Sequence, residues 1–586
     1  MTAFLNVTSS LSNRKWIGPS CEQDRLASSI AQINSLSQLT GLLLAKRNIG
    51  PTQVKSFLTP KIREEMPDPY ILNDVKKTSQ RLIKAIINKQ KICIFADYDV
   101  DGTVSASILY LWFKAYNIIP EVYIPDRVKE GYGPNTEAME VLAKRNDLII
   151  CVDCGTVAHD ALNIAQKEGA ETIILDHHQS DSELPPAFAV VNPKRKDETE
   201  KIDYLCAAGV VFIVLVAVNR LLREQKKETY DLMSFLDLVA LATVADVVPL
   251  IKLNRAIVSQ GLRIFAKRNR PGLVALADSA GLKAKPDSSH LSFLIAPRIN
   301  AAGRLADANL AVKLFTSETL NEAYPVATEL NKLNSERRSI EESILEQALD
   351  QIKTVSSDKS LIWVASKDWH PGVIGIVAAR LKEKLNLPVI VLYIDENGIA
   401  VGSARSIVGI DIGDKIRKVT KSGHFLAGGG HALAAGLKCR QELLIESMSV
   451  LENEINKASF ISTASQKLEI DSLITTQGVT TELVEEINGV GPFGSGNPAP
   501  RVVIANCQIK NLKILNGKHM KFVCQDRTQK RLEAIFFNSA DSIAGQRLNA
   551  AIGESFHLCG KLEINDWGGY RRVVLQVEDV SLIQPT

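Results

Sequence analysis

The chain has 586 residues, of which 45% are hydrophobic and 23% charged, and its formal net charge is +3. This composition is ordinary for a folded protein of several domains, and it excludes both a disordered chain and a strongly basic nucleic-acid coat protein. The longest apolar run, residues 205–218, suits a buried helix better than a membrane span. Nine cysteines without framework spacing, and an N-terminal stretch without a secretory pattern, lead us to expect a cytoplasmic protein with no membrane partner.

After an expected N-terminal extension over residues 1–70, the chain alternates short apolar runs with helical stretches. The runs at 91–95, 122–124, 148–152 and 171–175 have the length and composition of buried strands. Strands separated by helices of this length indicate βαβ units, and therefore a parallel sheet. We expect an α/β protein of several domains, the first of which spans residues 71–320.

The first apolar run leads into IFADYDVDG, which places Asp97, Asp99 and Asp101 at alternating positions. These carboxylates repel one another unless they share a cation. A calcium EF-hand loop begins in the same way, but it needs a preceding helix and a Glu at position 12, where this chain has a strand and Ile108. The remaining alternatives are a solvated acidic turn and a different metal site.

Polar residues follow the later runs at equivalent places. VDCGT puts Asp153 directly after the third run, and LDHH puts Asp176, His177 and His178 after the fourth. Because the carboxyl ends of parallel strands meet at one edge of a sheet, these side chains should converge with the first motif. Asp246, in LDLVALATVADVVPL, stands alone among apolar residues, where a cap, a turn or metal ligation would explain it.

The converging residues supply carboxylates and imidazoles without needing a thiolate, which favours Mn²⁺ or Mg²⁺ over structural zinc. The expected metal ligands are Asp97, Asp99, Asp101, Asp153, His177 and Asp246. This set exceeds the needs of one octahedral ion that keeps waters, so we expect two ions with Asp153 as the bridge. Such a pair suits in-line displacement at phosphorus. The catalytic candidates are Asp153, Asp176 and His178, the last because it could hold or protonate the scissile phosphate.

The four motifs DYDVDGTVSAS, VDCGT, LDHH and ATVADVVPL resemble, in that order, the motifs of DHH-family phosphoesterases. Within that family the chain is most similar to bacterial single-stranded-DNA exonucleases, over nearly its full length. The resemblance implies a metal-dependent exodeoxyribonuclease that degrades single-stranded DNA from 5′ to 3′ and releases 5′ mononucleotides in DNA repair and recombination. It also suggests helicases and single-strand-binding protein as candidate partners.

The second half contains features that the resemblance assigns to the substrate. In SFLIAPRINAAGRLADA, Arg298, Asn300 and Arg304 could mark only a helix start with surface arginines. The resemblance implies instead that they lie beside the metal site and face the nucleic-acid backbone. Apolar residues at helical spacing then predict one long connector helix over 321–355.

Residues 356–460 begin a second α/β unit that resembles the DHHA1 substrate-binding domain. In GHFLAGGGHALAAGL, three glycines precede His431 and an expected small-residue helix, so that backbone N–H groups could approach an anion. The resemblance further implies a 5′-phosphate pocket formed by Ser403, Arg405 and Arg127, which suits guanidinium and hydroxyl chemistry. His370 and His431 are either phosphate neighbours or structural histidines. Together, the expected substrate-binding residues are Arg127, Arg298, Asn300, Arg304, His370, Ser403, Arg405, Gly428, Gly429, Gly430 and His431.

Residues 461–586 include a Gly- and Pro-rich stretch, 487–500, that is typical of an interdomain linker. Five short β-rich runs follow it and predict an OB-like barrel that binds single strands. From residue 501 onward the chain has twelve Lys and Arg against eight Asp and Glu, which suits a basic groove with aromatic platforms. The aromatic candidates, most of which we expect in the core, are Phe522, Phe536, Phe537, Trp567 and Tyr570.

Three other functions remain open. A small-substrate DHH phosphoesterase, such as a pyrophosphatase or an oligoribonuclease, would not need the basic C-terminal barrel. A catalytically silent DNA-binding scaffold should have lost acidic ligands, and all the expected ones are present here. A duplex-specific nuclease would differ only in the width of its cleft, which the sequence does not give.

Overall fold

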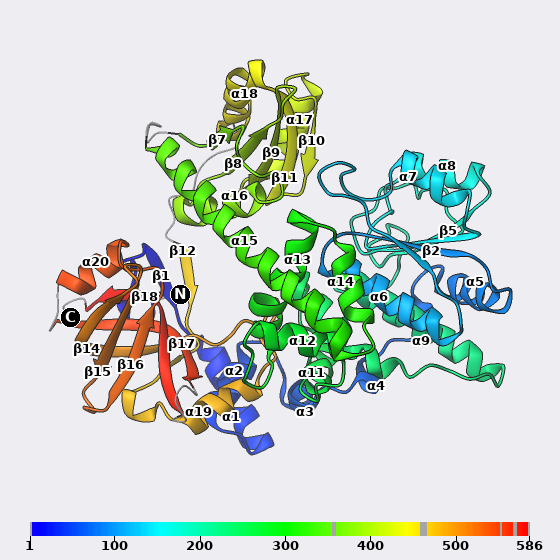
Figure 1. Cartoon of the computed structure of the whole chain (residues 1–586). Helices are drawn as coiled ribbons and strands as arrows, with labels where there is room; N and C mark the ends of the chain where they lie inside the picture. The colour runs from blue at the N-terminus through cyan, green and yellow to red at the C-terminus, as the bar shows by residue number, and fades with distance from the viewer. Residues whose placement is uncertain (1–2, 354–358, 458–465, 551–553, 566–570, 584–586) are drawn as a thin grey trace. The chain divides into compact units, whose positions relative to one another are not determined.

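The computed structural model describes residues 3–353, 359–457, 466–550, 554–565 and 571–583 (Figure 1). The chain divides into two compact units. The larger comprises Pro67–Asp246 and Gly261–Ser462, and the smaller comprises Met1–Met66, Val247–Gln260 and Thr463–Thr586. Among the described helices, none combines the length and the apolarity that a membrane crossing requires.

The larger unit contains a five-stranded sheet in the order β3-β2-β4-β5-β6, in which all neighbouring strands run parallel. The central strands β2 and β4 are buried at every residue, which explains their unbroken apolar sequences. The predicted parallel sheet is confirmed. Its strands are β2 (Ile92–Ala96), β3 (Glu121–Tyr123), β4 (Leu148–Val152), β5 (Glu171–Leu175) and β6 (Ala189–Val191).

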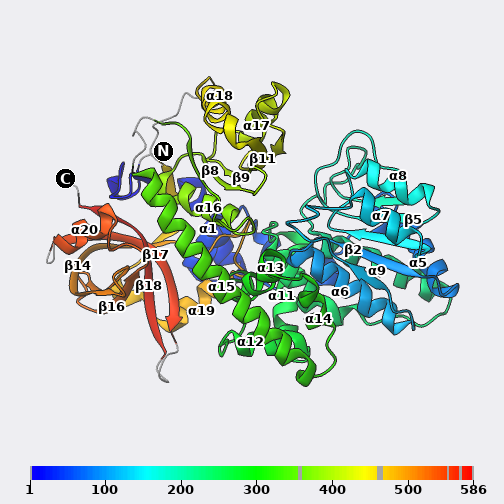
Figure 2. The ribbon, with the colours of Figure 1, turned by 45° about the horizontal axis from the view of Figure 1, so that its top comes forward.

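Helices cover both faces of this sheet (Figures 1 and 2). α5 and α6 both pack against α9 on one face, and α7 packs against α8 on the other. Most of the apolar run 205–218 lies in α9, and the run is buried almost throughout, as the sequence predicts. These helices are α5 (Val75–Ile87), α6 (Val100–Ala115), α7 (Thr136–Ala143), α8 (His159–Lys167) and α9 (Ala207–Glu224).

A second group of helices follows in the chain and packs around the long helix α15 (Leu320–Ile352), which has the length expected of the connector. α13 begins directly after a π-helical turn, His290–Ile295. The other helices of this group are α12 (Pro271–Ser279), α13 (Ala296–Leu305) and α14 (Asn309–Thr316). α10 (Leu236–Ala245) packs against α6 and α9, and the residues of α11 (Lys252–Phe265) are divided between the two units.

The larger unit also contains a mixed five-stranded sheet, in the order β10-β11-β9-β8-β7. α16 packs against β8 and β9, whereas α17 packs against β10 and β11 and also against α18. The elements are β7 (Ile362–Ser366), α16 (Ile374–Leu385), β8 (Val389–Ile394), β9 (Ile399–Arg405), α17 (Ile412–Lys421), β10 (Ala427–Gly430), β11 (Ala434–Arg440) and α18 (Leu444–Asn456).

The small-residue helix expected after His431 is wrong. Residues Ala434–Arg440 form strand β11, which pairs with β10 on one side and β9 on the other. Every second residue of β11 is exposed and the residues between are covered, which is the two-residue period of a strand.

The smaller unit is built around a closed barrel. β14 pairs with both β15 and β17, β16 pairs with β15 and β18, and β17 pairs with β18, so the predicted OB-like barrel is confirmed. Phe522 and Phe536 are buried in its core, Phe537 is 49% exposed, and Trp567 and Tyr570 lie outside the described residues. The elements are β14 (Val502–Leu515), β15 (His519–Gln525), β16 (Arg531–Phe536), α20 (Ile543–Ala550), β17 (Ser555–Asn565) and β18 (Arg572–Leu582).

The N-terminal segment belongs to this barrel unit. β1 (Arg14–Ile17) pairs in parallel with β12 (Gln466–Glu469), and the indole of Trp16 donates to a carboxylate oxygen of Asp579 at 2.8 Å. The same unit includes α1 (Cys21–Asn34), α2 (Gln38–Ala45), α3 (Val54–Leu58), α4 (Ile62–Glu65), β13 (Ser472–Leu473) and α19 (Thr481–Gly489).

The stretch 487–500, which has the composition of a linker, is folded into the same unit. Val490 is fully buried in the core, and the guanidinium of Arg255 donates to the carbonyl oxygens of Val490 and Gly491 at 2.9 and 2.6 Å. This Gly- and Pro-rich stretch is therefore a packed part of the unit and not an interdomain linker.

Candidate active site

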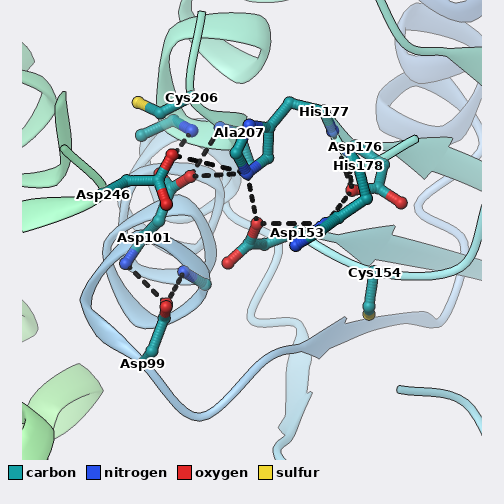
Figure 3. A network of polar contacts seen from close by, with 12 residues as sticks. Asp99, Asp101, Asp153, Cys154, Asp176, His177, His178, Cys206, Ala207 and Asp246 are labelled. Atoms are coloured by element: carbon teal, nitrogen blue, oxygen red, sulfur yellow. Dashed lines mark hydrogen bonds and ion pairs between the residues drawn. The ribbon is translucent and has the colours of Figure 1, made fainter. Parts of the chain in front are cut away.

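The candidate site lies at the carboxyl edge of the parallel sheet, between β2 and β4. The chain leaves β2 for β3 on one side and then crosses to β4 on the other. β2 and β4 are therefore the two strands of a topological switch point, which is where α/β sheets bind their ligands. Asp97 follows β2, Asp153 follows β4, and the run Asp176-His177-His178 follows β5. Figure 3 shows that the side chains after β4 and β5 point toward those at the start of α6.

The first acidic motif is fixed by a strand end and a helix cap. Asp99 accepts hydrogen bonds from the backbone N–H groups of Asp101 (2.8 Å) and Gly102 (3.1 Å) and so caps α6. Asp97 is only 5% exposed. Glycine is required at 102 because a Cβ there would lie 2.4 Å from the carbonyl oxygen of Asp97. The alternating carboxylates therefore have defined positions.

Asp101 and Asp246 reach the site from helices. Asp101 accepts from the N–H groups of Ala207 (2.6 Å) and Ala208 (2.8 Å), the first residues of α9, where a helix N-terminus stabilises a carboxylate. Asp246 is the C-cap of α10. The Nε2 atom of His177 lies 3.7 Å from Oδ2 of Asp101 and 3.6 Å from Oδ2 of Asp246 (Figure 3). One imidazole therefore faces both carboxylates.

Asp153 lies at the junction of the cluster. Its backbone is left-handed, with φ at 59°, a conformation that Asp adopts more readily than most residues. The hydroxyl of Tyr132 donates to its carbonyl oxygen at 3.0 Å. Its Oδ1 atom lies 3.2 Å from Nε2 of His177 and 3.9 Å from Nδ1 of His178. The turn after β4 thus aims this carboxylate at both histidines.

Asp176 lies in a hydrogen-bond network beside the acidic cluster. One oxygen accepts from the N–H and the hydroxyl of Thr156 at 3.2 and 2.6 Å, and the other lies 2.8 Å from Nδ1 of His178. The amide of Asn192 donates to the Thr156 hydroxyl and to the His178 carbonyl oxygen, both at 2.9 Å. Burial alone would raise the pKa of Asp176, but the hydrogen bonds from His178 and Thr156 lower it below its ordinary value. Asp176 therefore stays charged and orients the His178 ring.

Three overlapping groups of possible metal ligands occur among the described residues. In each group the ligand atoms lie within 4.8 Å of one another. Asp153 belongs to two of the groups, which is the arrangement expected of a carboxylate that bridges two ions. The groups are Asp97-Asp99-Asp153, Asp153-His177-His178 and Asp101-His177-Asp246.

The chemistry of these donors fits a divalent cation. Oδ1 of Asp97 and Oδ1 of Asp153 are buried and find no hydrogen-bond donor in the described part of the chain. Burial, followed by neighbouring carboxylate charge, raises the pKa of Asp101 to about 7 and that of Asp246 to about 8. Burial, followed by the charge of the adjacent imidazole, lowers the pKa of His177 to about 3, which leaves one ring nitrogen with a lone pair available for a metal. Mn²⁺ and Mg²⁺ both accept such an oxygen-rich set.

Three arginines lie near enough that their charges affect one another. Burial, followed by the charge of Arg127, lowers the pKa of Arg405 and lowers that of Arg304 to about 10. Arg405 donates to the Ser403 hydroxyl at 3.1 Å, and Arg304 donates to the Gly372 carbonyl oxygen at 2.9 Å. Across the described ranges none of the three forms an ion pair with a carboxylate. Guanidinium groups without acidic partners, together with a hydroxyl, suit a multiply charged anion.

Two of the other substrate candidates, Arg298 on α13 and His370 before α16, form hydrogen bonds within the protein. Arg298 is 7% exposed and donates to the side chain of Asn331, which fixes α13 against α15. Oδ1 of Asn300 is buried without a hydrogen-bond donor among the described residues. Nδ1 of His370 accepts from the N–H of Gly372 at 3.1 Å, and burial lowers the pKa of His370.

The glycine run lies in strand β10. Gly428, Gly429 and Gly430 pair with β11, and the N–H of His431 donates to a carbonyl oxygen of the same hairpin at 2.8 Å. A Cβ at Gly428 would lie 2.6 Å from the side chain of Ile416 in α17. This glycine therefore allows α17 to pack closely on the strand.

Sequence reasoning missed three residues that support the site: Tyr132, Thr156 and Asn192. Asn192 directly follows β6, so the strand-end signal that identified Asp153 could have found it. Thr156 ends the quoted motif VDCGT, but nothing in a sequence shows that its hydroxyl reaches Asp176. Tyr132 lies in the loop between β3 and α7, whose path the sequence does not fix.

Three family models match the chain. They are the DHH family N-terminal domain over residues 91–243, the DHHA1 domain over 358–463 and the RecJ OB domain over 470–579. Two solved structures are also similar. RecJ of Thermus thermophilus in complex with Mn²⁺ is 25% identical with a TM-score of 0.81, covering 98% of this chain and 80% of that chain. An exonuclease RecJ bound to manganese is 31% identical with a TM-score of 0.58, covering 67% of this chain and 96% of that chain.

Curated relatives that match this chain over most of their length share one name. The single-stranded-DNA-specific exonuclease RecJ of Bacillus subtilis (strain 168) is 32% identical over 97% of this chain and 71% of that protein. The protein of that name from Haemophilus influenzae is 32% identical over 89% of this chain and 92% of that protein. With the site, the three domains and these relatives in agreement, the chain belongs to the RecJ family of single-stranded-DNA-specific exonucleases.

Proposed function

We propose that this protein is a metal-dependent exonuclease that degrades single-stranded DNA from its 5′ end and releases 5′ mononucleotides. The observation that carries the proposal is a set of three ligand groups, two of which share Asp153, in the same unit as three arginines that have no acidic partner among the described residues. The names of the curated relatives support the substrate. The direction and the product rest on the 5′-phosphate pocket that the family resemblance implies, to which we assign the arginine site formed by Arg127, Arg304, Arg405 and Ser403.

The carboxylate and imidazole cluster would hold the metal ions. The ligands would be Asp97, Asp99, Asp101, Asp153, His177 and Asp246, and Asp153 belongs to two of the ligand groups. Bound divalent ions would supply Lewis acidity toward the scissile phosphate and a nucleophile at neutral pH. His178 directs Nδ1 at Asp176, and its Nε2, which lies 3.5 Å from the Tyr132 hydroxyl, is the nitrogen that would donate to the scissile phosphate or to the leaving oxygen. Asp176 contributes by holding that ring in place.

The arginine site would recognise the terminal phosphate. Arg127, Arg304, Arg405 and the Ser403 hydroxyl offer donors for a dianion, which a 5′-phosphorylated end has and an internal phosphodiester lacks. An end held there presents the next phosphodiester to the metal cluster. If the bound end is a 5′-phosphorylated one, this arrangement supports 5′-to-3′ polarity and a mononucleotide product.

The barrel would bind the strand beyond the cleavage site. The residues of β15 alternate between core and surface, and Lys521 on the surface pairs in register with Lys513 of β14. At the end of the same face the ring of His519 lies edge-on to Phe537, with centroids 5.4 Å apart. Lysines beside an exposed aromatic ring are the combination that binds single strands without sequence preference.

The cellular setting is also a proposal. All nine cysteines are free thiols, which suits a reducing cytoplasm. A single-strand exonuclease needs a supply of unwound DNA, so helicases and single-strand-binding protein are the partners to test.

The decisive experiment offers 5′-labelled single-stranded DNA, the matching duplex and pyrophosphate, each with Mn²⁺, Mg²⁺ or EDTA. We expect immediate release of labelled mononucleotide from the single strand only, and none in EDTA. Asp153→Asn should abolish the release, whereas Asp160→Asn, an exposed Asp at the start of α8, should retain it. Equal cleavage of duplex, activity on pyrophosphate alone, or label released last would contradict the proposal.

A further inference from the structure

Tyr98 joins the arginine site to the metal cluster. It stands between Asp97 and Asp99, two residues of one ligand group. The guanidinium carbon of Arg127 lies 4.9 Å from the centroid of its ring, within the range of a cation–π contact. Arg127 comes from the loop after β3, and no carboxylate pairs with it in the described ranges. The ring of Tyr98 is thus a direct contact between the metal-binding loop and that guanidinium.

The backbone of Tyr98 is also in close contact with α13. A Cβ at Gly303 would lie 2.7 Å from the carbonyl oxygen of Tyr98 and 3.2 Å from its Cβ, so only glycine allows this approach. The next residue is Arg304, whose pKa is lowered by burial and then by the charge of Arg127. Two of the three arginines are therefore anchored at Tyr98, one by its ring and one through its backbone.

The loop that holds Arg127 makes a second connection to the metal cluster. Its Tyr132 hydroxyl donates to the carbonyl oxygen of Asp153 at 3.0 Å. The loop is consequently fixed at one place to the motif after β2 and at another to the turn after β4. A shift of Arg127 relative to the metal ligands would have to break the stacking on Tyr98.

We propose that Tyr98 is a positioning residue that sets the distance between the 5′-phosphate and the metal cluster, and thereby the release of one nucleotide at a time. This role rests on the proposed function. The contact uses the face of the ring, so an aromatic residue is needed and the hydroxyl is not. Without the ring, the guanidinium has no fixed position, and the terminal phosphate is held at more than one distance from the ligands.

Two variants test the role: Tyr98→Leu removes the aromatic face, and Tyr98→Phe keeps it. The first readout is the length of the products from a 5′-phosphorylated single strand. The second, in EDTA and without turnover, is the ratio of affinities for 5′-phosphorylated and 5′-hydroxyl strands. For Tyr98→Leu we expect di- and trinucleotides among the products and a roughly tenfold smaller affinity ratio. For Tyr98→Phe both readouts should match the wild type.

The role would be overturned if Tyr98→Leu released only mononucleotides and kept the wild-type affinity ratio. It would also be overturned if Tyr98→Phe lost as much of the affinity ratio as Tyr98→Leu. Thermal unfolding and Mn²⁺ binding check that the variants are folded. If Tyr98→Leu loses Mn²⁺ binding, Tyr98→Met takes its place with the same expectation. A wild type that ignores the 5′ phosphate would instead refute the proposed 5′ function, which separates the two failures.

Discussion

The Nε2 atom of His177 lies 3.2 Å from Oδ1 of Asp153, and both atoms are buried without a hydrogen-bond partner among the described residues. Burial lowers the pKa of His177 to about 3 and also raises the pKa of Asp153, so each group is driven toward its neutral form. With both groups neutral, no ion pair holds these two atoms together. A cation bound between them would stabilise the charged carboxylate of Asp153, and both atoms would become its ligands.

The first prediction concerns metal binding without DNA. Asp153→Asn removes the one carboxylate shared by two ligand groups, so Mn²⁺ affinity should fall by more than about 100-fold, beyond the loss seen for residues that only support ligands. Isothermal titration calorimetry with MnCl₂ measures the Mn²⁺ affinity, and Asp160→Asn is the control. Unchanged Mn²⁺ binding in Asp153→Asn would show that the cluster is not the metal site.

The second prediction separates positioning from ligation. Thr156→Val removes the hydroxyl that donates to Asp176 at 2.6 Å, so the His178 ring loses its fixed orientation while the ligands remain. We expect the turnover number on single-stranded DNA to fall about 10- to 100-fold, with Mn²⁺ affinity within a few-fold of the wild type. Thr156→Ser restores the hydroxyl and should recover the rate. A Ser variant as slow as the Val variant would argue against the hydrogen bond.

The metal cluster was predictable because its signals are local. Each ligand on the sheet directly follows an unbroken apolar run, and such runs form strands whose ends meet at one edge. Asp97 and Asp153 could be placed together on that basis alone. Asp246 was harder, since it ends a helix and its direction depends on how α10 packs.

Other features depend on contacts between residues far apart in the chain. The pairing of β1 with β12 joins segments about 450 residues apart, and neither strand shows its partner in its sequence. The run after His431 contains mainly small residues, whose pattern favours neither a helix nor a strand, and pairing with β9 and β10 decides it. The supporting role of Thr156 likewise exists only in three dimensions.

The third prediction addresses recognition of the 5′ end. Arg405→Lys keeps the charge but loses the forked guanidinium that donates beside Ser403. We expect the preference for 5′-phosphorylated over 5′-hydroxyl single strands, measured as the ratio of kcat/KM, to fall at least about tenfold. Arg440→Lys, at the exposed end of β11, is the matched control and should leave the ratio unchanged. An unaltered ratio in Arg405→Lys would remove Arg405 from the site.

The fourth prediction tests the outer face of the barrel. Phe537→Ala removes the exposed ring beside His519, and stacking of one base is worth about 1–3 kcal/mol. Affinity for long single strands, measured in EDTA by fluorescence anisotropy, should fall accordingly, while cleavage of very short strands stays the same. Ile33→Ala removes another exposed apolar residue, from α1 of the same unit, and serves as the control. If both variants bind long strands as the wild type does, Phe537 is not a stacking residue.

The fifth prediction is a pH dependence of stability in the barrel unit. Asp526 is 5% exposed and accepts hydrogen bonds from the N–H and hydroxyl groups of both Thr476 and Thr528, at 2.6–2.9 Å. Burial would raise its pKa, but these four hydrogen bonds lower the pKa below the ordinary value. The lowered pKa stabilises the folded state above the unfolded-state pKa of about 4, and this contribution is lost as the pH falls through the folded-state pKa.

Asp526→Asn replaces one acceptor oxygen with an NH₂ group that opposes these donors, so it should cost about 1–3 kcal/mol at pH 7. Since the wild-type carboxylate loses its advantage on protonation, the difference between the two proteins should narrow at pH 3. Thermal unfolding at both pH values measures this difference in stability, and Asp541→Asn, at an exposed position, is the control. A gap of equal size at both pH values would mean that the cost comes from shape alone, and that the charge of Asp526 does not stabilise the barrel unit.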